Sequence, residues 1–315
     1  MSNNNDIELF NSDDCTKYVN QFIAEFPLRR AEIGQGTVIK RALPSRHKRM
    51  IGAWCFLDHA GPAHFPQGDG LDVGPHPHIG LQTFTWMIEG TMMHRDSLGS
   101  AQLLRPRQVN LMTAGYGISH SEVAPETETK MHAAQLWIAL PDDMVNMAPA
   151  FDHYPELPVV EDQGIEFTVL VGEYLKAISP VKVHSELLGV DLYAADSTQA
   201  VLPLHPKFEY GFLALEGTAS INGHELTEDN MVILEPGLER VHVEIHAGSR
   251  VLLLGGEPFE SPILLWWNFV GRTTEELKMA REQWIAEHER FGSISAYEGP
   301  RLEAPAFPGH MRPSK

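Results

Sequence analysis

Short runs of alternating apolar and polar residues occupy most of the chain between residues 33 and 260. The runs are rich in Val, Ile, Thr, Phe and Tyr, and Gly, Pro, Asn and Asp separate them, as around 82–88, 109–112, 135–140 and 166–171. Such runs at close spacing are typical of β-strands. Many short strands without intervening helices predict an all-β sandwich or barrel.

Two segments near the ends of the chain have the periodicity of an amphipathic helix. In segment 13–26 the apolar positions fall on one helical face: Cys15, Tyr18, Val19, Phe22, Ile23 and Phe26. In segment 273–290, Thr273 and Glu276 form a capping-box motif. The face that follows it carries Leu277, Ala280, Trp284, Ile285 and His288. We therefore expect an N-terminal helix and a C-terminal helix beside the strands.

A weak internal repeat divides the strand-rich region into two halves. Residues 86–91 resemble residues 213–218, and residues 109–115 resemble residues 231–237. Prolines crowd the strand-poor stretch 141–164 between the halves, so we predict two β-domains of one type. The expected segments are a helical extension over 1–30, a first domain over 31–150, a second domain over 160–295 and a proline-rich tail over 296–315. Within the second domain, Asn222-Gly223 predicts a tight hairpin turn.

Composition changes the picture in two respects. Acidic residues outnumber basic ones by 42 to 24, and the formal net charge of −18 disfavours direct contact with nucleic acid or an anionic membrane. The one noticeable basic stretch is interpreted as a solvated face: Arg29, Arg30, Lys40, Arg41, Arg46, Lys48 and Arg49. Only two cysteines, Cys15 and Cys55, are present among the 315 residues, which favours unpaired thiols and a cytoplasmic location. No run of about 18 apolar residues predicts a membrane span.

Histidine and glutamate residues combine into a candidate metal site in the first half. His76 and His78 are two residues apart, and so are His120 and Glu122. Residues i and i+2 of a strand point to the same side, so each pair can converge from its own strand. Three imidazoles and one carboxylate suit a single divalent transition metal. We predict His76, His78, His120 and Glu122 as its ligands.

The repeat places three similar residues in the second half. His78 plus 127 is His205, while His120 and Glu122 plus 122 give His242 and Glu244. The position that corresponds to His76 is Pro203. Two His and one carboxylate can hold a ferrous ion, so a second occupied site stays open. The loss of one ligand favours a vestigial site.

Several motifs resemble those of the pirin family, two-domain members of the cupin superfamily. The most specific are His76–Gly80 and Met112–Glu122, with Asp58–Pro62, Glu89-Gly90 and His94–Gly99 in support. The resemblance runs from about residue 30 to about 295. It implies two jelly-roll β-barrels in tandem. It also implies iron at His76, His78, His120 and Glu122, with the C-terminal barrel normally free of metal.

Two activities are attached to the resemblance. Some bacterial members resemble quercetinases, which cleave flavonols with O₂ and release carbon monoxide. Eukaryotic members resemble regulatory proteins that act through protein partners and respond to the state of their iron. Our prediction is an Fe(II)-dependent dioxygenase, with Mn, Ni, Co, Cu or Zn as other metals the site can hold. A redox-responsive regulator without catalysis is the alternative.

For catalysis, the metal would lower the pKa of the bound flavonol hydroxyl, and Glu122 would accept its proton. An apolar cleft is expected from five side chains: Phe56, Phe84, Trp86, Met112 and Tyr116. The alternative interpretation of these residues is barrel core. Tyr116 stands where many relatives have arginine, and Gln82 where many cupins have glutamate. His59 and His64 either line the mouth of the site or are exposed, and His94 is interpreted as a hydrogen-bonded hairpin residue.

Overall fold

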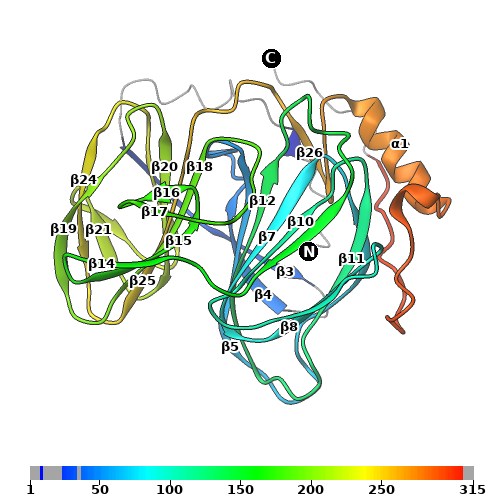
Figure 1. The fold of residues 1–315 in the computed structure, drawn as a ribbon, viewed down its shortest axis with the longest axis horizontal. Helices are drawn as coiled ribbons and strands as arrows, with labels where there is room; N and C mark the ends of the chain where they lie inside the picture. The colour runs from blue at the N-terminus through cyan, green and yellow to red at the C-terminus, as the bar shows by residue number, and fades with distance from the viewer. Residues whose placement is uncertain (1–7, 10–22, 34–36, 308–315) are drawn as a thin grey trace.

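The computed structural model describes residues 8–9, 23–33 and 37–307. Over these ranges the chain forms two barrels side by side, with one α-helix at the C-terminal end (Figure 1). Both barrels have a seven-stranded sheet and a four-stranded sheet, all antiparallel in their pairings. The predicted all-β fold in two repeated domains is confirmed.

The first barrel pairs a large sheet with a small one. The large sheet, in spatial order, contains β13 (Ala150–Tyr154), β10 (Val109–Thr113), β7 (Leu81–Gly90), β12 (Lys130–Ala139), β5 (Trp54–His64), β4 (Thr37–Leu43) and β3 (Arg29–Ile33). The small sheet contains β6 (Asp72–His78), β11 (Ile118–Val123), β8 (Met92–Asp96) and β9 (Ala101–Leu104).

The second barrel has the same strand order when its large sheet is followed from the opposite edge. Its large sheet contains β14 (Val159–Asp162), β15 (Ile165–Val171), β18 (Leu187–Ala194), β25 (Ser249–Gly256), β20 (Glu209–Glu216), β23 (Asn230–Leu234) and β2 (Ile23–Pro27). Its small sheet contains β19 (Thr198–Pro203), β24 (Arg240–Ile245), β21 (Ala219–Ile221) and β22 (His224–Leu226). Strands β7 and β20, and β10 and β23, hold equivalent places, as the sequence repeat predicts.

Short elements complete the fold. Strands β26 (Leu264–Trp266) and β27 (Phe269–Gly271) form a hairpin that also pairs with β1 (Glu8–Leu9), while β16 (Glu173–Tyr174) pairs with β17 (Ala177–Ile178). Helix α1 (Thr274–Ile285) has the predicted capping box at Thr273 and Glu276. A 3₁₀ turn at Glu289–Phe291 follows it. The described part of the chain contains no helix long and apolar enough to cross a membrane.

The prediction of an N-terminal helix over 13–26 is wrong at its end. Residues 10–22 lie outside the described residues, but Ile23–Pro27 form β2, which pairs with β23 at the edge of the second barrel's large sheet. Phe26 packs into the cluster between the barrels. A short apolar run fits either periodicity, and here an available sheet edge decides in favour of a strand. The C-terminal helix also ends earlier than predicted, and Ile285 is exposed.

The two large sheets face each other and bury an apolar layer between the barrels. Trp54, Trp86 and Leu111 from the first barrel join Leu213 and Leu252 from the second in one cluster. Trp86 donates from its indole N–H to the Asp191 carboxylate across this layer (3.0 Å). The layer therefore fixes the outward face of β7 as an interface between domains.

The basic stretch of the sequence contributes to the same contact. Lys48 is buried and pairs with Glu209 (2.5 Å), and Lys40 pairs with Glu228 (3.4 Å). Arg41 forms a buried ion pair with Asp58 inside the first barrel. The interpretation of this stretch as a solvated face is therefore wrong for these three cations, which hold the fold together. Buried cations need such partners because an unpaired charge is costly to bury.

Candidate metal centre

Three imidazoles converge inside the first barrel. His76 and His78 lie on β6 and His120 on β11, and the pairing of these strands places His120 opposite His76. All three side chains are fully buried, and their ligand nitrogens lie within 4.8 Å of one another. Among the described residues this is the one group of His, Cys, Asp or Glu side chains with such spacing. The predicted three-histidine cluster is therefore present.

Backbone carbonyls orient two of these imidazoles. His76 Nδ1 lies 2.8 Å from the carbonyl of Gly74, and His78 Nδ1 lies 2.9 Å from the carbonyl of Asn268. A carbonyl can only accept, so Nδ1 carries the proton and Nε2 keeps its lone pair. His76 Nε2 is buried without a hydrogen-bond partner. This arrangement leaves Nε2 available to a metal.

The imidazoles are also electrically neutral at ordinary pH. Burial lowers the pKa of His78 to about 3. Burial and the neighbouring imidazoles hold the pKa of His76 and that of His120 well below the usual range. Neutral imidazole is the form that binds a metal. A buried unpartnered nitrogen among three neutral imidazoles fits a divalent transition metal.

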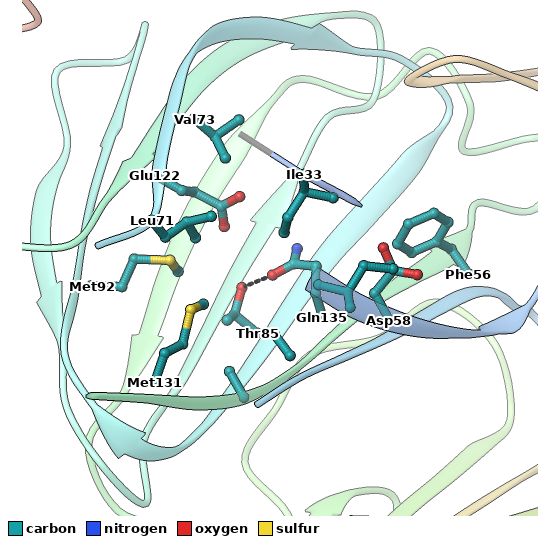
Figure 2. Close-up of a pocket in the computed structure, with 13 residues that line it drawn as sticks. Ile33, Phe56, Asp58, Leu71, Val73, Thr85, Met92, Glu122, Met131 and Gln135 are labelled. Atoms are coloured by element: carbon teal, nitrogen blue, oxygen red, sulfur yellow. Dashed lines mark hydrogen bonds between the residues drawn. The ribbon is translucent and has the colours of Figure 1, made fainter. Parts of the chain in front are cut away.

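Glu122 lies outside this cluster of ligand atoms. Its side chain points into a neighbouring enclosed cavity of about 30 Å³, which Figure 2 shows. Between His120 and Glu122 the pairing of β11 with β6 shifts at a bulge, so that Glu122 lies opposite Val73. Burial raises the pKa of Glu122 above its ordinary value. The arrangement suits a carboxyl group that takes up and releases a proton.

The cavity beside Glu122 has mostly apolar walls. Ile33, Leu71, Val73, Met92 and Met131 line it. Its other polar groups are paired: Thr85 donates to Gln135 (2.7 Å), and Asp58 accepts two bonds from Arg41. A cavity of this size has room for about one water molecule.

The five predicted cleft residues are not brought together. Phe56 lines the cavity, where its ring stacks on Trp137 at 4.0 Å. Met112 is buried in the core beside it. Phe84 and Trp86 point the opposite way, into the layer between the barrels, because alternate residues of β7 face opposite sides. Their assignment to the cleft is therefore a misreading of which face of β7 is inside.

Tyr116 lies at the surface rather than in the cavity, and the residue is 44% exposed. The Arg290 guanidinium stacks on its ring at 4.3 Å and donates to its backbone carbonyl. A positive charge is thus present beside this position, although it comes from the C-terminal segment. Gln82 also points away from the cluster and donates to the carbonyl of Lys182.

The remaining sequence candidates do not join the centre. His59 is buried, with its Nε2 2.9 Å from that of His132, so it neither lines a mouth nor is exposed. His64 is exposed at the end of β5. His205, His242 and Glu244 are all exposed, and His242 and Glu244 face outward from β24. The described structure gives no second metal cluster.

The sequence did not predict two residues that contact the histidine cluster. Asn268 reaches His78 from 190 residues away, and Trp137 packs edge-on against the same imidazole at 5.1 Å. The exposure of His242 and Glu244 could have been predicted from the sequence. Strand β24 reads Arg-Val-His-Val-Glu-Ile, in which apolar residues alternate with these two polar residues. In a strand with one buried face, the Val and Ile side chains take the inside.

Comparison with family models and known proteins agrees with this architecture. Residues 36–138 match the pirin model, and residues 189–292 match the model of the pirin C-terminal cupin domain. The chain is 50% identical over 309 residues, 98% of each chain, to a Pseudomonas aeruginosa protein named "Putative quercetin 2,3-dioxygenase". It is 39% identical to a pirin-like protein of Caulobacter vibrioides, covering 83% of this chain and 92% of the relative.

Solved structures give the same picture. A crystal structure of quercetin 2,3-dioxygenase from Acinetobacter baumannii has a TM-score of 0.92 at 72% identity, covering 94% of this chain and 99% of that one. A bacterial pirin from Escherichia coli, solved in complex with nickel(II), shares the fold at a TM-score of 0.59 and 20% identity, with 75% and 99% covered.

Proposed function

The chain belongs to the pirin family, and from that premise we propose that it is an Fe(II)-dependent dioxygenase that cleaves flavonols such as quercetin with O₂ and releases carbon monoxide. The observation that carries the proposal is the juxtaposition of three neutral, buried imidazoles with the raised-pKa carboxyl of Glu122. The name of the 72% identical Acinetobacter baumannii structure supports the same reaction.

In this proposal His76, His78 and His120 hold the metal through Nε2. A bound divalent iron would supply Lewis-acid polarisation of the flavonol oxygens and a site for one-electron chemistry with O₂. Mn, Ni, Co, Cu and Zn also accept such nitrogen ligands. The surrounding apolar shell, including Trp137, excludes water from the centre.

Glu122 takes the proton of the flavonol 3-hydroxyl group. A carboxyl group with a raised pKa is a stronger base once ionised, and its apolar surroundings favour transfer of the proton to it. Its place in the cavity, apart from the imidazole nitrogens, favours this role over that of a permanent fourth ligand. The fourth-ligand role stays a prediction.

Substrate binding requires the cavity to widen, since a three-ring flavonol far exceeds about 30 Å³. Met92 and Met131 line the wall, and Met side chains rearrange easily because they are unbranched. Ile33 and Phe56 supply apolar surface for the rings. We expect these side chains to move when a flavonol enters.

The decisive experiment supplies quercetin to anaerobic, iron-loaded protein and then admits O₂. We expect loss of the flavonol absorbance with release of carbon monoxide. Absence of both, with iron still bound, would exclude the activity.

A regulatory function is the second candidate, and the burial of the centre favours it. All three imidazoles have no exposed surface, and Asn268 covers His78. A closed metal centre can report redox state to a protein partner without turnover. Iron bound without flavonol cleavage would support this candidate.

A further inference from the structure

His94 and Asp96 lie next to the metal centre on a strand that supplies none of the ligands. Both are on β8, which pairs with β11 so that Asp96 lies opposite His120 and His94 opposite Glu122. Directly opposed residues share a face of the sheet, so both point into the barrel. Both residues are buried, and their side chains are 3% and 0% exposed.

A chain of side chains runs from Asp96 through His94 to His120. Asp96 Oδ2 is 3.1 Å from His94 Nε2, and His94 Nδ1 is 3.3 Å from His120 Nδ1. The backbone N–H groups of Leu98 and Ser100 donate to Asp96 Oδ1 and hold the carboxylate in place. Phe151 stacks on the His94 ring at 4.3 Å and 13°, which fixes its plane.

The direction of each hydrogen bond follows from the chemistry of the end group. Burial alone would raise the pKa of Asp96, but hydrogen bonds from His94 and Ser100 outweigh burial and lower the pKa. An ionised carboxylate only accepts, so His94 Nε2 carries the proton. With a proton of His94 held on Nε2 by Asp96, His94 Nδ1 is the acceptor where the two Nδ1 atoms meet, and His120 Nδ1 is the donor. The lone pair of His120 is left on Nε2, which lies 3.1 Å from His78 Nε2.

We propose that Asp96 and His94 are positioning residues that set the tautomer of His120 and thereby the affinity of the first barrel for its metal. His76 and His78 obtain the same orientation from backbone carbonyls, which no substitution removes. His120 depends on side chains alone. Partners of this kind hold a ligand in the binding tautomer, and their loss costs 10–100-fold in metal affinity. The proposal rests on the metal site of the proposed function and is independent of flavonol cleavage.

The first test is a titration of the metal-free full chain with Co(II), followed by the visible absorption of the bound ion. An Asp96→Asn side chain can donate to His94 Nε2 and reverse the whole chain of hydrogen bonds. We expect about 10–100-fold weaker Co(II) binding. Asp191→Asn is the matched control, because Asp191 is an equally buried carboxylate between the barrels. Its Co(II) affinity should equal that of the wild type.

Two substitutions of His94 separate positioning from packing. His94→Asn places an amide oxygen where Nδ1 lies, so it can accept from His120 without help from Asp96. Its affinity should stay within about threefold of the wild type, whereas His94→Leu should lose about 10–100-fold. In the His94→Asn background, Asp96→Asn should cost nothing further.

The result that would overturn the proposal is Asp96→Asn binding Co(II) as the wild type does, or an equal loss in both His94 variants. If Asp96→Asn does not fold, the two His94 variants decide between the outcomes. Flavonol cleavage is measured in a separate experiment. Failure of the positioning role of Asp96 and His94 can therefore be distinguished from failure of the proposed function.

Discussion

The two barrels share one strand order but present opposite chemistry to their interiors. In the first, His120 and Glu122 of β11 point inward among polar and apolar groups. In the second, the equivalent strand β24 turns Val241, Val243 and Ile245 inward and leaves His242 exposed. A shift of one residue relative to the core exchanges the two faces of a strand. Identical residues at repeat spacing therefore make a metal centre in one barrel and surface in the other.

The interiors differ in what keeps them stable. The second barrel is filled by one apolar cluster that includes Phe167, Phe212 and Leu253. The first barrel buries imidazoles and carboxylates, which need partners to offset desolvation. The Arg41–Asp58 ion pair and the bond from Thr85 to Gln135 provide some of them. The first barrel thus has polar groups of the candidate metal centre where the second barrel has apolar side chains.

The largest expected effect comes from replacing a histidine by alanine in the first barrel, compared with the same replacement in the second barrel. His78→Ala removes a buried ligand and should lower flavonol cleavage more than about 100-fold. Loss of a group that only hydrogen-bonds to a ligand already costs about 10–100-fold in metal affinity or activity, and loss of the ligand itself should cost more. His242→Ala should leave the rate unchanged, since that side chain is exposed. Steady-state rates of iron-loaded protein measure both, and equal losses would remove the distinction between the barrels.

The next effect concerns Glu122. Glu122→Gln cannot accept a proton, so kcat should fall about 10²–10⁴-fold, the usual contribution of a general base. The bound iron, measured on the same sample, should remain. A variant that loses its iron would instead identify Glu122 as an essential ligand.

The apolar interior of the second barrel should matter for stability alone. Leu253→Ala leaves a cavity in its core and should lower the free energy of unfolding by about 2–5 kcal/mol. Chemical denaturation measures the loss. Metal affinity should not change, and a weakened affinity would mean that the barrels are energetically coupled.

The most gradual effect is a pH dependence at the border of the two barrels, where His132 Nδ1 lies 3.3 Å from Glu216 of the second barrel. Burial lowers the pKa of His59 to about 3 and that of His132 to about 4, from an ordinary 6.5. Between pH 6.5 and about 4 the unfolded chain binds more protons, so stability falls as the pH falls.

Each of these two histidines contributes at most about 1.4 kcal/mol per pH unit to that decline. Replacing both by asparagine should flatten the decline in denaturant midpoints over this window. An unchanged slope would show that other groups control it.

Local sequence patterns were enough to predict several features of this structure. Asn222 and Gly223 both have positive φ in the predicted hairpin between β21 and β22, because that dipeptide tolerates the turn. The capping box of α1 is equally local. The three-histidine cluster was predictable because residues i and i+2 of a strand point to the same side. Two such residue pairs on neighbouring strands can therefore converge in only a few ways.

Long-range contacts account for what could not be predicted. The alternation of β7 shows that Phe84 and Thr85 face opposite sides, but the side that meets another barrel depends on tertiary structure. Pairing of Ile23–Pro27 with β23 joins segments about 200 residues apart. The contact between His59 and His132 likewise links distant positions on neighbouring strands.

The metal content of purified protein tests the central claim most directly. After loading with iron and removal of excess metal, elemental analysis should find one iron per chain in the wild type and in His242→Ala, and almost none in His120→Ala. Iron retained in full by His120→Ala, or lost from His242→Ala, would contradict the assignment of the metal centre to the first barrel.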